Sequence, residues 1–396
     1  MKPTDEPSET RRRPESPLHS YPYWAPRFWH GMTLGSWLPL LIRNRFAVSP
    51  SRWPIAATIT AASVLNSFAS VFDHLMFSYR ARTTRLKEAP LFVLGHWRSG
   101  TTLLHELLIL DPRHTYPTTY QCFEPNHFLW TEWFVAPMSR WSLPPTRPMD
   151  NMATGWEKPQ EDEFALCNLG VPSPYLAWAF PNHGPVNDEY LDLVSLPATE
   201  RERWKKAWRE FVLRVASIRN RRIVLKSPTH TARVRTILEV FPDAKFVHIV
   251  RDPVVLYAST VKLWRSLSLA EGMQLPADRE WDWIERQVLD TFVRMYERFE
   301  QDRELVPPGR LIDVRYEDLV ADQVGVMRQI YEELDLGNFA SVEPAVSEYA
   351  RQKRDYRTNK HVIPPEVAER VRRRWAPYFE RYGYTMAEAV EVLMRN

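Results

Sequence analysis

The segment from Gly95 to Thr102 has the residue types best suited to chemistry. It reads Gly-His-Trp-Arg-Ser-Gly-Thr-Thr, directly after an apolar run at 91–94 and directly before a predicted helix. Glycines let the backbone wrap around an anion, and the N–H groups at the start of a helix donate hydrogen bonds to its oxygens. The side chains of Arg98, Ser99, Thr101 and Thr102 add a guanidinium and three hydroxyls. The segment therefore predicts an anion-binding loop.

The spacing of this loop matches the phosphate loop G-x-x-x-x-G-K-[ST], except that Thr101 stands where the lysine belongs. There is also no obvious acidic residue at a strand end to hold the magnesium ion that an ATP-using enzyme needs. The residues therefore favour an anionic ligand that requires no metal. A phosphate-loop kinase using ATP is the first alternative, and magnesium dependence would distinguish it.

Three further polar residues follow the ends of predicted strands. Lys226 ends the apolar run 222–226, Arg251 follows the run 245–250, and Ser259 lies about two turns into the next predicted helix. Ligands of parallel sheets bind outside the carboxyl ends of the strands, which is where these side chains are expected. Two simpler readings stay open: Arg251 could form a salt bridge with Asp252, and Lys226 could extend to solvent from a sheet edge.

The elements that must position these residues form an α/β pattern. Four short apolar runs, at 91–94, 222–226, 245–250 and 311–314, alternate with helical stretches, as in a parallel sheet with crossover helices. We expect a three-layer α/β/α fold, similar to phosphate-loop proteins, over residues 86–396. An insertion at about 112–198, rich in Pro and Trp, is expected to build an acceptor pocket or lid. The stretch 366–381 is expected to be an exposed basic helix.

The first 85 residues differ in composition from the rest. Residues 1–20 lack apolar residues for a core and predict a disordered tail, whereas 21–85 predict a helical extension. The run 55–72 is about long enough to cross a bilayer, but its Ser, Thr and Asn residues and the following Asp73 make it a poor transmembrane candidate. The extension could pack on its own core or lie at a membrane surface. A membrane-surface protein that binds an anion without turnover is the second alternative function.

Composition sets wider limits. The chain has 396 residues, is 44% hydrophobic, and carries 52 Lys and Arg against 49 Asp and Glu, a net charge of 52 − 49 = +3. These values exclude a disordered or collagen-like chain, and the charge is too small to drive nucleic-acid binding. Two cysteines cannot form a disulfide framework, and residues 1–20 lack the apolar region of a secretory signal. We expect a cytoplasmic location, with peripheral contact at the inner membrane surface left open.

Two segments of the chain resemble a known family. PLFVLGHWRSGTTLLHELL and KFVHIVRDPVVLYAS are similar to the two nucleotide-binding segments of sulfotransferases that use 3′-phosphoadenosine 5′-phosphosulfate (PAPS). The resemblance runs from about Pro90 to Leu336, and Arg98 in R-S-G-T-T is similar to the bacterial and Golgi branches. It implies a single α/β domain, PAPS as co-substrate and no metal.

The same resemblance implies roles for individual residues. Arg98, Ser99, Gly100, Thr101 and Thr102 would hold the 5′-phosphosulfate, and Arg251 and Ser259 would hold the 3′-phosphate. Lys226 would contact the donor and neutralise the charge that develops on the bridging oxygen. In the family a late basic segment folds over the 3′-phosphate, which implies Lys360 or Arg357 here, although a solvated charge run is the alternative.

The general base has three candidates. His230 lies four residues after Lys226 and titrates in the right range, so it is favoured. Glu124 resembles a glutamate of the glucosaminyl branch, with a spacing to its histidine that is longer by one residue. The acidic triplet Glu161, Asp162 and Glu163 is the third candidate.

These observations predict a sulfotransferase that moves a sulfuryl group from PAPS to a hydroxyl or amine. A roomy, partly apolar pocket built by the insertion suits a small-molecule, lipid or carbohydrate acceptor. The sequence indicates neither the identity of the acceptor nor the oligomeric state.

Overall fold

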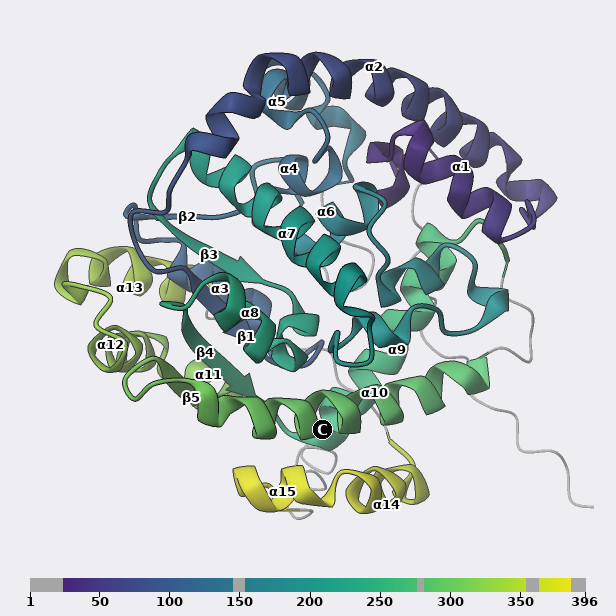
Figure 1. Cartoon of the computed structure of the whole chain (residues 1–396). Coiled ribbons are helices and arrows are strands. Elements are labelled where there is room, and N and C mark those ends of the chain that lie inside the picture. Colours follow the sequence, from purple (N-terminus) through teal and green to yellow (C-terminus); the bar gives the residue numbers. More distant parts are fainter. Residues whose placement is uncertain (1–23, 145–153, 276–280, 354–362, 386–396) are drawn as a thin grey trace, which may run out of the picture.

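The computed structural model describes residues 24–144, 154–275, 281–353 and 363–385 (Figure 1). Five parallel strands form one sheet in the order β2-β3-β1-β4-β5. They are β1 (Leu91–Leu94), β2 (His114–Thr115), β3 (Arg222–Lys226), β4 (Lys245–Val250) and β5 (Leu311–Arg315). The four predicted strands and the α/β fold are confirmed. Strand β2 was not predicted, because two residues without an apolar run leave no periodic signal.

Helices cover both faces of the sheet, as the alternation of side chains along a strand requires. Leu91 and Val93 of β1 point to the face covered by α3 (Thr101–Leu108), α12 (Gln323–Glu333) and α13 (Glu343–Gln352). Phe92 and Leu94 point to the other face, covered by α7 (Ala198–Ile218), α8 (Val234–Val240) and α10 (Trp281–Asp302). Every residue of β1, β3 and β4 except Lys245 is buried, which explains their continuous apolar runs.

The remaining helices of the α/β domain follow β4 and β5. Helix α9 (Pro253–Glu271) begins with Asp252 as its cap, whose Oδ1 accepts from the N–H groups of Val254 and Val255 at 2.9 and 3.0 Å. Helix α11 (Tyr316–Ala321) follows β5 directly. The predicted basic helix at 366–381 is two helices, α14 (Pro365–Arg374) and α15 (Ala376–Tyr382), separated at Trp375. The indole of Trp375 stacks on Phe292 of α10, so only one side of this segment is exposed.

The insertion between β2 and β3 contains short helices, because its prolines interrupt any longer one. They are α4 (Thr119–Phe123), α5 (Phe128–Met138) and α6 (Asp162–Asn168), joined by 3-10 turns. The N-terminal extension forms a 3-10 turn, η1 (Phe28–Gly31), and helices α1 (Leu34–Arg43) and α2 (Trp53–Thr83). Figure 1 shows α2 along the edge of the molecule, beyond α5 and α1. The predicted tail at 1–20, Arg357 and Lys360 lie outside the described residues.

Candidate functional site

The predicted anion-binding loop connects β1 to α3 at the centre of the sheet. Strand β1 lies between β3 and β4, with Val93 paired to Lys226 and to Val247. Because the three strands are parallel, their carboxyl ends meet at one edge. Lys226 at the end of β3 and Arg251 after β4 therefore flank the loop from its two sides, as the sequence predicted.

The backbone of the loop adopts conformations that explain its glycines. Gly100 has a φ of 102°, and a Cβ atom there would lie 2.3 Å from the ring of Tyr316. Gly95 has a φ of 144°, and its N–H donates to Thr231 Oγ1 at 2.8 Å. Arg98 has a φ of 69°, which is unusual for a residue with a side chain. Strain of this kind concentrates at ligand-binding loops, and here it directs the chain into the start of α3.

Arg98, Arg251 and Ser259 form one connected cluster. Arg98 Nε donates to Ser259 Oγ at 2.9 Å, and Arg251 Nη1 donates to the carbonyl oxygen of Arg98 at 2.9 Å. The Arg251 guanidinium lies 4.2 Å from the centre of the Tyr316 ring. Burial lowers the pKa of Arg251 from its ordinary value, because a low-dielectric environment disfavours the cation. An anion bound beside this cluster would offset that cost.

Lys226 and Glu161 form an ion pair at the other side of the loop. Lys226 Nζ lies 2.8 Å from Glu161 Oε1 and 3.5 Å from Thr102 Oγ1. The second oxygen, Glu161 Oε2, accepts from the Tyr175 hydroxyl at 2.6 Å, and that hydroxyl accepts from Trp97 Nε1 at 3.0 Å. Both carboxylate oxygens of Glu161 are thus held in place. Its side chain is 15% exposed, against 3% for Lys226, so it is accessible to a ligand.

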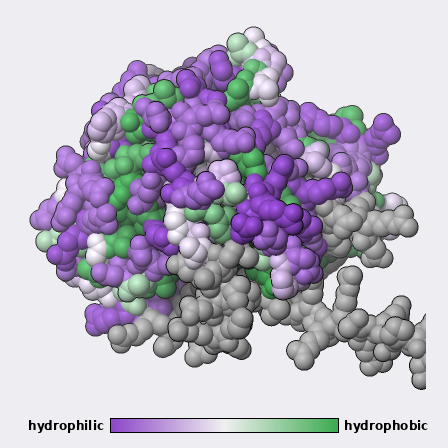
Figure 2. Space-filling model, turned by 90° about the horizontal axis from the view of Figure 1, so that it is seen from below, coloured by the Kyte–Doolittle hydropathy of each residue, from purple (hydrophilic) through white to green (hydrophobic). Residues whose placement is uncertain are grey.

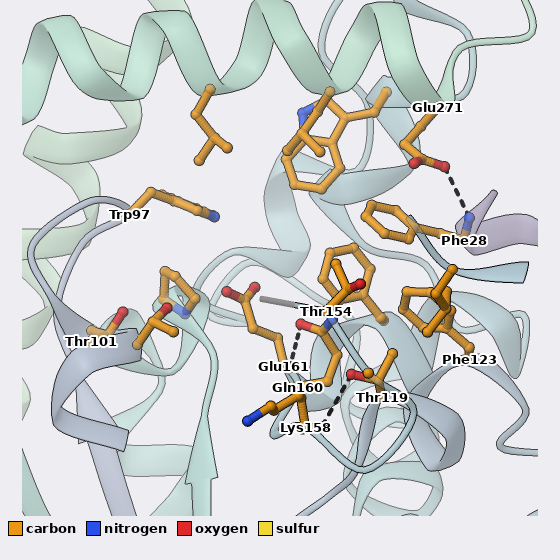
Figure 3. A pocket seen from close by; sticks show the side chains of 18 of the residues that line it. Phe28, Trp97, Thr101, Thr119, Phe123, Thr154, Lys158, Gln160, Glu161 and Glu271 are labelled. Atoms are coloured by element: carbon orange, nitrogen blue, oxygen red, sulfur yellow. Dashed lines mark hydrogen bonds between the residues drawn. The ribbon is translucent and has the colours of Figure 1, made fainter. Parts of the chain in front are cut away.

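A cavity of about 120 Å³ lies against this ion pair (Figure 3). Thr101 and Glu161 point into one part of it, whereas Phe28 and Phe123 lie at the opposite end in the view. The insertion supplies most of the lining, together with residues of the loop, of η1 and of α9. The part beside the anion-binding loop thus combines Thr101 and Glu161 with Trp97, and the far part combines Phe28 and Phe123 with Thr119 and Glu271. The lining includes Phe28, Phe123, Leu143, Pro144, Phe164, Trp178, Leu263 and Leu267 among the apolar residues, and Arg98, Thr101, Thr102, Lys158 and Glu161 among the polar ones.

His230, the favoured base in the sequence analysis, lies outside this cavity. Its side chain is fully buried, and Nε2 lies 2.8 Å from Asp162 Oδ2. Asp162 also accepts from Ser227 Oγ and Trp208 Nε1, and the paired His230 holds the pKa of Asp162 well below its ordinary value against the effect of burial. A histidine enclosed in this way cannot reach an acceptor hydroxyl. We therefore replace His230 with Glu161 as the candidate base.

The three acidic residues of the triplet have separate environments. Glu163 is fully buried, pairs with Arg233, and accepts from Ser173 Oγ at 2.6 Å and Thr229 Oγ1 at 2.9 Å. Asp162 faces the same buried region, and only Glu161 lines the cavity among these three. Glu161 immediately precedes α6, where successive side chains point in different directions, so only one of three neighbours can face the ligand.

Glu124, the second candidate, also lies away from the cavity. It follows α4, and Oε2 lies 3.1 Å from His127 Nε2. His127 in turn contacts Asn66 Oδ1 of α2 at 3.1 Å. This pair joins the insertion to the N-terminal extension, which is a positioning role rather than contact with a reacting group.

Several residues that line the cavity were missed by the sequence analysis. Phe28 belongs to the extension, Thr119 and Lys158 to the insertion, and Glu271 to the last turn of α9. Glu271 Oε2 accepts from the N–H of Phe28 at 2.9 Å, which ties the extension to the α/β domain. No local motif marks these residues, since neighbouring members of the set are 39 to 113 positions apart in the sequence and meet only through the fold.

The raised pKa of the buried Glu271 carboxyl group predicts that the stability of the protein depends on pH. Burial raises its pKa from 4.5 to about 7. The folded protein therefore binds this proton more tightly than the unfolded chain, so the free energy of unfolding decreases as pH rises from about 5 to about 7. In Glu271→Gln, which keeps an acceptor for Phe28, we expect this contribution to disappear. Urea unfolding at several pH values should show the variant gaining stability relative to the parent as pH rises; parallel curves would contradict the assignment.

Comparisons with known proteins agree with this geometry. A model of the sulfotransferase family matches residues 90–340. The chain is 44% identical over 372 residues to the omega-hydroxy-beta-dihydromenaquinone-9 sulfotransferase Stf3 of Mycobacterium bovis, covering 94% of this chain and 95% of that protein. The values for Stf3 of Mycobacterium tuberculosis are the same.

Two solved structures share the fold. The crystal structure of sulfotransferase STF1 from Mycobacterium tuberculosis has a TM-score of 0.59 at 19% identity, covering 87% of this chain and 91% of that one. Sulfotransferase STF9 from Mycobacterium avium has a TM-score of 0.58 at 20% identity, covering 89% and 96%. The fold similarity, the family match and the similarity to Stf3 confirm the prediction of a PAPS-dependent sulfotransferase over that of an ATP-using kinase: this chain belongs to the sulfotransferase family.

Proposed function

We propose that this protein transfers the sulfuryl group of PAPS to the terminal hydroxyl of a hydroxylated menaquinone-type lipid. The observation that carries the proposal is the position of Glu161, which contacts Lys226 and lines a largely apolar cavity beside the anion-binding loop. Similarity to Stf3 over nearly the whole of both chains supports this acceptor class. A long apolar chain with one reactive hydroxyl suits a cavity that is lined by many aromatic and aliphatic side chains and has Glu161 beside the loop.

The loop residues bind the donor in this proposal. PAPS supplies the sulfuryl group, and the N–H groups at the start of α3 together with Arg98 hold its phosphosulfate. The cluster of Arg98, Arg251 and Ser259 is where the 3′-phosphate is expected. Lys360 stays a prediction of the sequence analysis.

Glu161 and Lys226 divide the chemistry between them. Glu161 takes the proton of the acceptor hydroxyl, whose oxygen forms the new bond to sulfur. The bond from sulfur to the bridging oxygen breaks, and its electron pair stays on the departing 3′-phosphoadenosine 5′-phosphate (PAP). Lys226, beside Thr102 of the loop, stabilises the negative charge on that oxygen. The ion pair with Lys226 holds Glu161 in place at the cavity before the reaction.

Labelled PAPS and four acceptors would test the acceptor class. We expect sulfation of an ω-hydroxylated menaquinone in detergent and no product from the same menaquinone without the hydroxyl. A carbohydrate and a primary amine of similar apolar size serve as the other two acceptors. Mass spectrometry of the products identifies which acceptor has gained a sulfuryl group. Sulfation of the carbohydrate alone would contradict a lipid acceptor.

The cytoplasmic location expected from the sequence also stays a proposal. Cys122 and Cys167 are both buried free thiols, and burial raises the pKa of each. Two buried thiols near the site support a reducing compartment.

A further inference from the structure

Helix α2 exposes large apolar residues to solvent, where a surface helix normally has polar ones. Its exposed side carries large apolar residues, of which Leu65, Phe68 and Leu75 are 69%, 72% and 74% exposed. From Trp53 to Phe72 the helix contains no charged residue. In water such a surface is unfavourable, and a patch of this size marks an interaction site.

The exposed apolar side chains on α2 and on the two helices that pack against it, α1 and α5, are here termed the apolar face. Helix α5 packs against α2, and the rings of Phe72 and Trp130 lie 4.5 Å apart. Most of the exposed large apolar residues in the described part of the chain belong to this face, whereas the others are scattered singly. The apolar face consists of Leu38, Ile42 and Phe46 beside α1, Trp53, Val64, Leu65, Phe68, Val71, Phe72, Leu75, Met76 and Tyr79 on α2, and Trp133, Met138 and Trp141 on and after α5.

The opposite side of the molecule is different. Figure 2 shows the surface seen from below in the orientation of Figure 1, away from α2, and it is predominantly hydrophilic with separate apolar areas. The asymmetry indicates that one side of the protein meets an apolar environment and the other meets water.

The inward side of α2 includes polar residues that are paired within the protein. Asp73 is buried and accepts from Arg214 Nη2 at 2.5 Å and from the N–H of Trp130 at 3.2 Å. Asn66 Nδ2 donates to the carbonyl oxygens of His30 at 2.6 Å and Met32 at 3.2 Å. By length and composition α2 could cross a membrane, with only 22% of its most apolar window buried. Crossing would strip Asp73 and Asn66 of these partners, so lying on a membrane with the protein side intact costs less.

The charges around the apolar face match an anionic lipid surface. Residues 34–87 contain one acidic residue, the buried Asp73, and seven basic ones. Most of the basic residues are exposed, and they lie in the last turns of α1 and α2 or just outside these helices: Arg43, Arg45, Arg52, Arg80, Arg82, Arg85 and Lys87. A bilayer with anionic headgroups neutralises this excess, while a symmetric pair of two copies would bring like charges together.

Segments of the apolar face adjoin segments that line the cavity. Trp141 belongs to the face, and Leu143 and Pro144, two and three residues later, line the cavity. On the other side Phe28 lines the cavity from η1, which packs on α2, with His30 Nε2 3.2 Å from Thr58 Oγ1. A bilayer under this face would therefore lie close to segments that carry Phe28, Leu143 and Pro144 of the cavity lining.

We propose that the apolar face docks on an anionic bilayer, with α2 lying in the interfacial plane, so that the acceptor lipid enters the cavity from the membrane. Helix α2 has 31 residues and is about 46 Å long, a large apolar contact for a peripheral protein. The proposal rests on the proposed function for the nature of the acceptor, although membrane binding itself can be measured without turnover.

Sedimentation of the full chain with vesicles tests this proposal. Vesicles contain phosphatidylcholine alone or with about a third phosphatidylglycerol. We expect strong binding to the anionic vesicles and several-fold weaker binding to the neutral ones or at high salt. The triple variant Leu65→Gln, Phe68→Gln and Leu75→Gln should bind anionic vesicles at least about 30-fold more weakly. PAP binding by calorimetry checks that it folds.

A matched variant controls for the loss of exposed apolar residues in general. Val194→Gln, Leu305→Gln and Val320→Gln changes three exposed residues outside the apolar face and should sediment like the parent. Equal vesicle binding by the two triple variants would overturn the proposal. So would absence of vesicle binding combined with a dimer, seen by analytical ultracentrifugation, that the α2 variant dissociates. Sulfation of the detergent-solubilised lipid would in either case leave the proposed function intact.

Discussion

Glu161→Gln is expected to lower kcat by about 10²- to 10⁴-fold, the usual contribution of a general base. Glutamine keeps the size of the side chain and an oxygen that can accept from Tyr175, but it cannot take the proton of the acceptor. Because the loop and the Arg98, Arg251 and Ser259 cluster are untouched, PAP should bind within a few-fold of the parent value. Initial rates with labelled PAPS and calorimetry with PAP provide the two measurements.

Two variants make the Glu161 result interpretable. Glu157→Gln removes an exposed carboxylate four residues earlier and should leave kcat unchanged. His230→Gln removes the other candidate from its buried pair with Asp162, so it should lower the unfolding midpoint more than the kcat of the folded protein. If His230→Gln abolishes turnover at full stability while Glu161→Gln remains active, the base assignment is wrong.

Lys226→Met is expected to lower kcat by about 10²- to 10³-fold, as when one preorganised donor to a developing anion is removed. Methionine fills a similar volume without the charge, so the buried end of β3 should stay packed. The positive charge matters most when the bond to the bridging oxygen breaks. We therefore expect kcat to fall more than the KM for PAPS rises.

The control for Lys226 is a lysine with ordinary ion pairs. Lys205 of α7 contacts Glu202 and Glu239 at the surface, and Lys205→Met should leave the kinetic constants unchanged. Lys226→Arg restores the charge in a larger group and should recover part of the lost kcat. A loss in Lys226→Met that appears only in the KM for PAPS would show a binding role without a part in the chemical step.

The donor side of the site could be predicted because its determinants are local. The loop at 95–102 has glycines where the backbone has positive φ, and it lies between a buried strand and a helix. Lys226 and Arg251 follow apolar runs, and parallel strands bring their carboxyl ends to one edge. Each feature can be read within about ten residues.

The base could not be predicted in this way. Glu124, Glu161 and His230 were all candidates in the sequence analysis, and all have residue types that accept protons. What separates them is burial: His230 is enclosed with Asp162, Glu124 pairs with His127, and Glu161 faces the cavity. The direction of the Glu161 side chain depends on its contacts with Lys226 of β3 and Tyr175 of η4 (Pro174–Trp178). These contacts join distant parts of the chain and cannot be predicted from residue spacing.

The environment of helix α2 also could not be predicted from the sequence alone. Its sequence is apolar enough for a core, a membrane span or a membrane surface, and composition alone left the choice between packing and surface open. The tertiary structure places Asn66 and Asp73 inside, against His127 and Arg214, and turns Phe68 and Leu75 outward. Local sequence thus determined the fold class and the donor loop, since strand periodicity and backbone conformation depend on neighbouring residues. Only the tertiary structure decided which carboxylate faces the cavity and which side of α2 is exposed, because both depend on contacts between residues far apart in the chain.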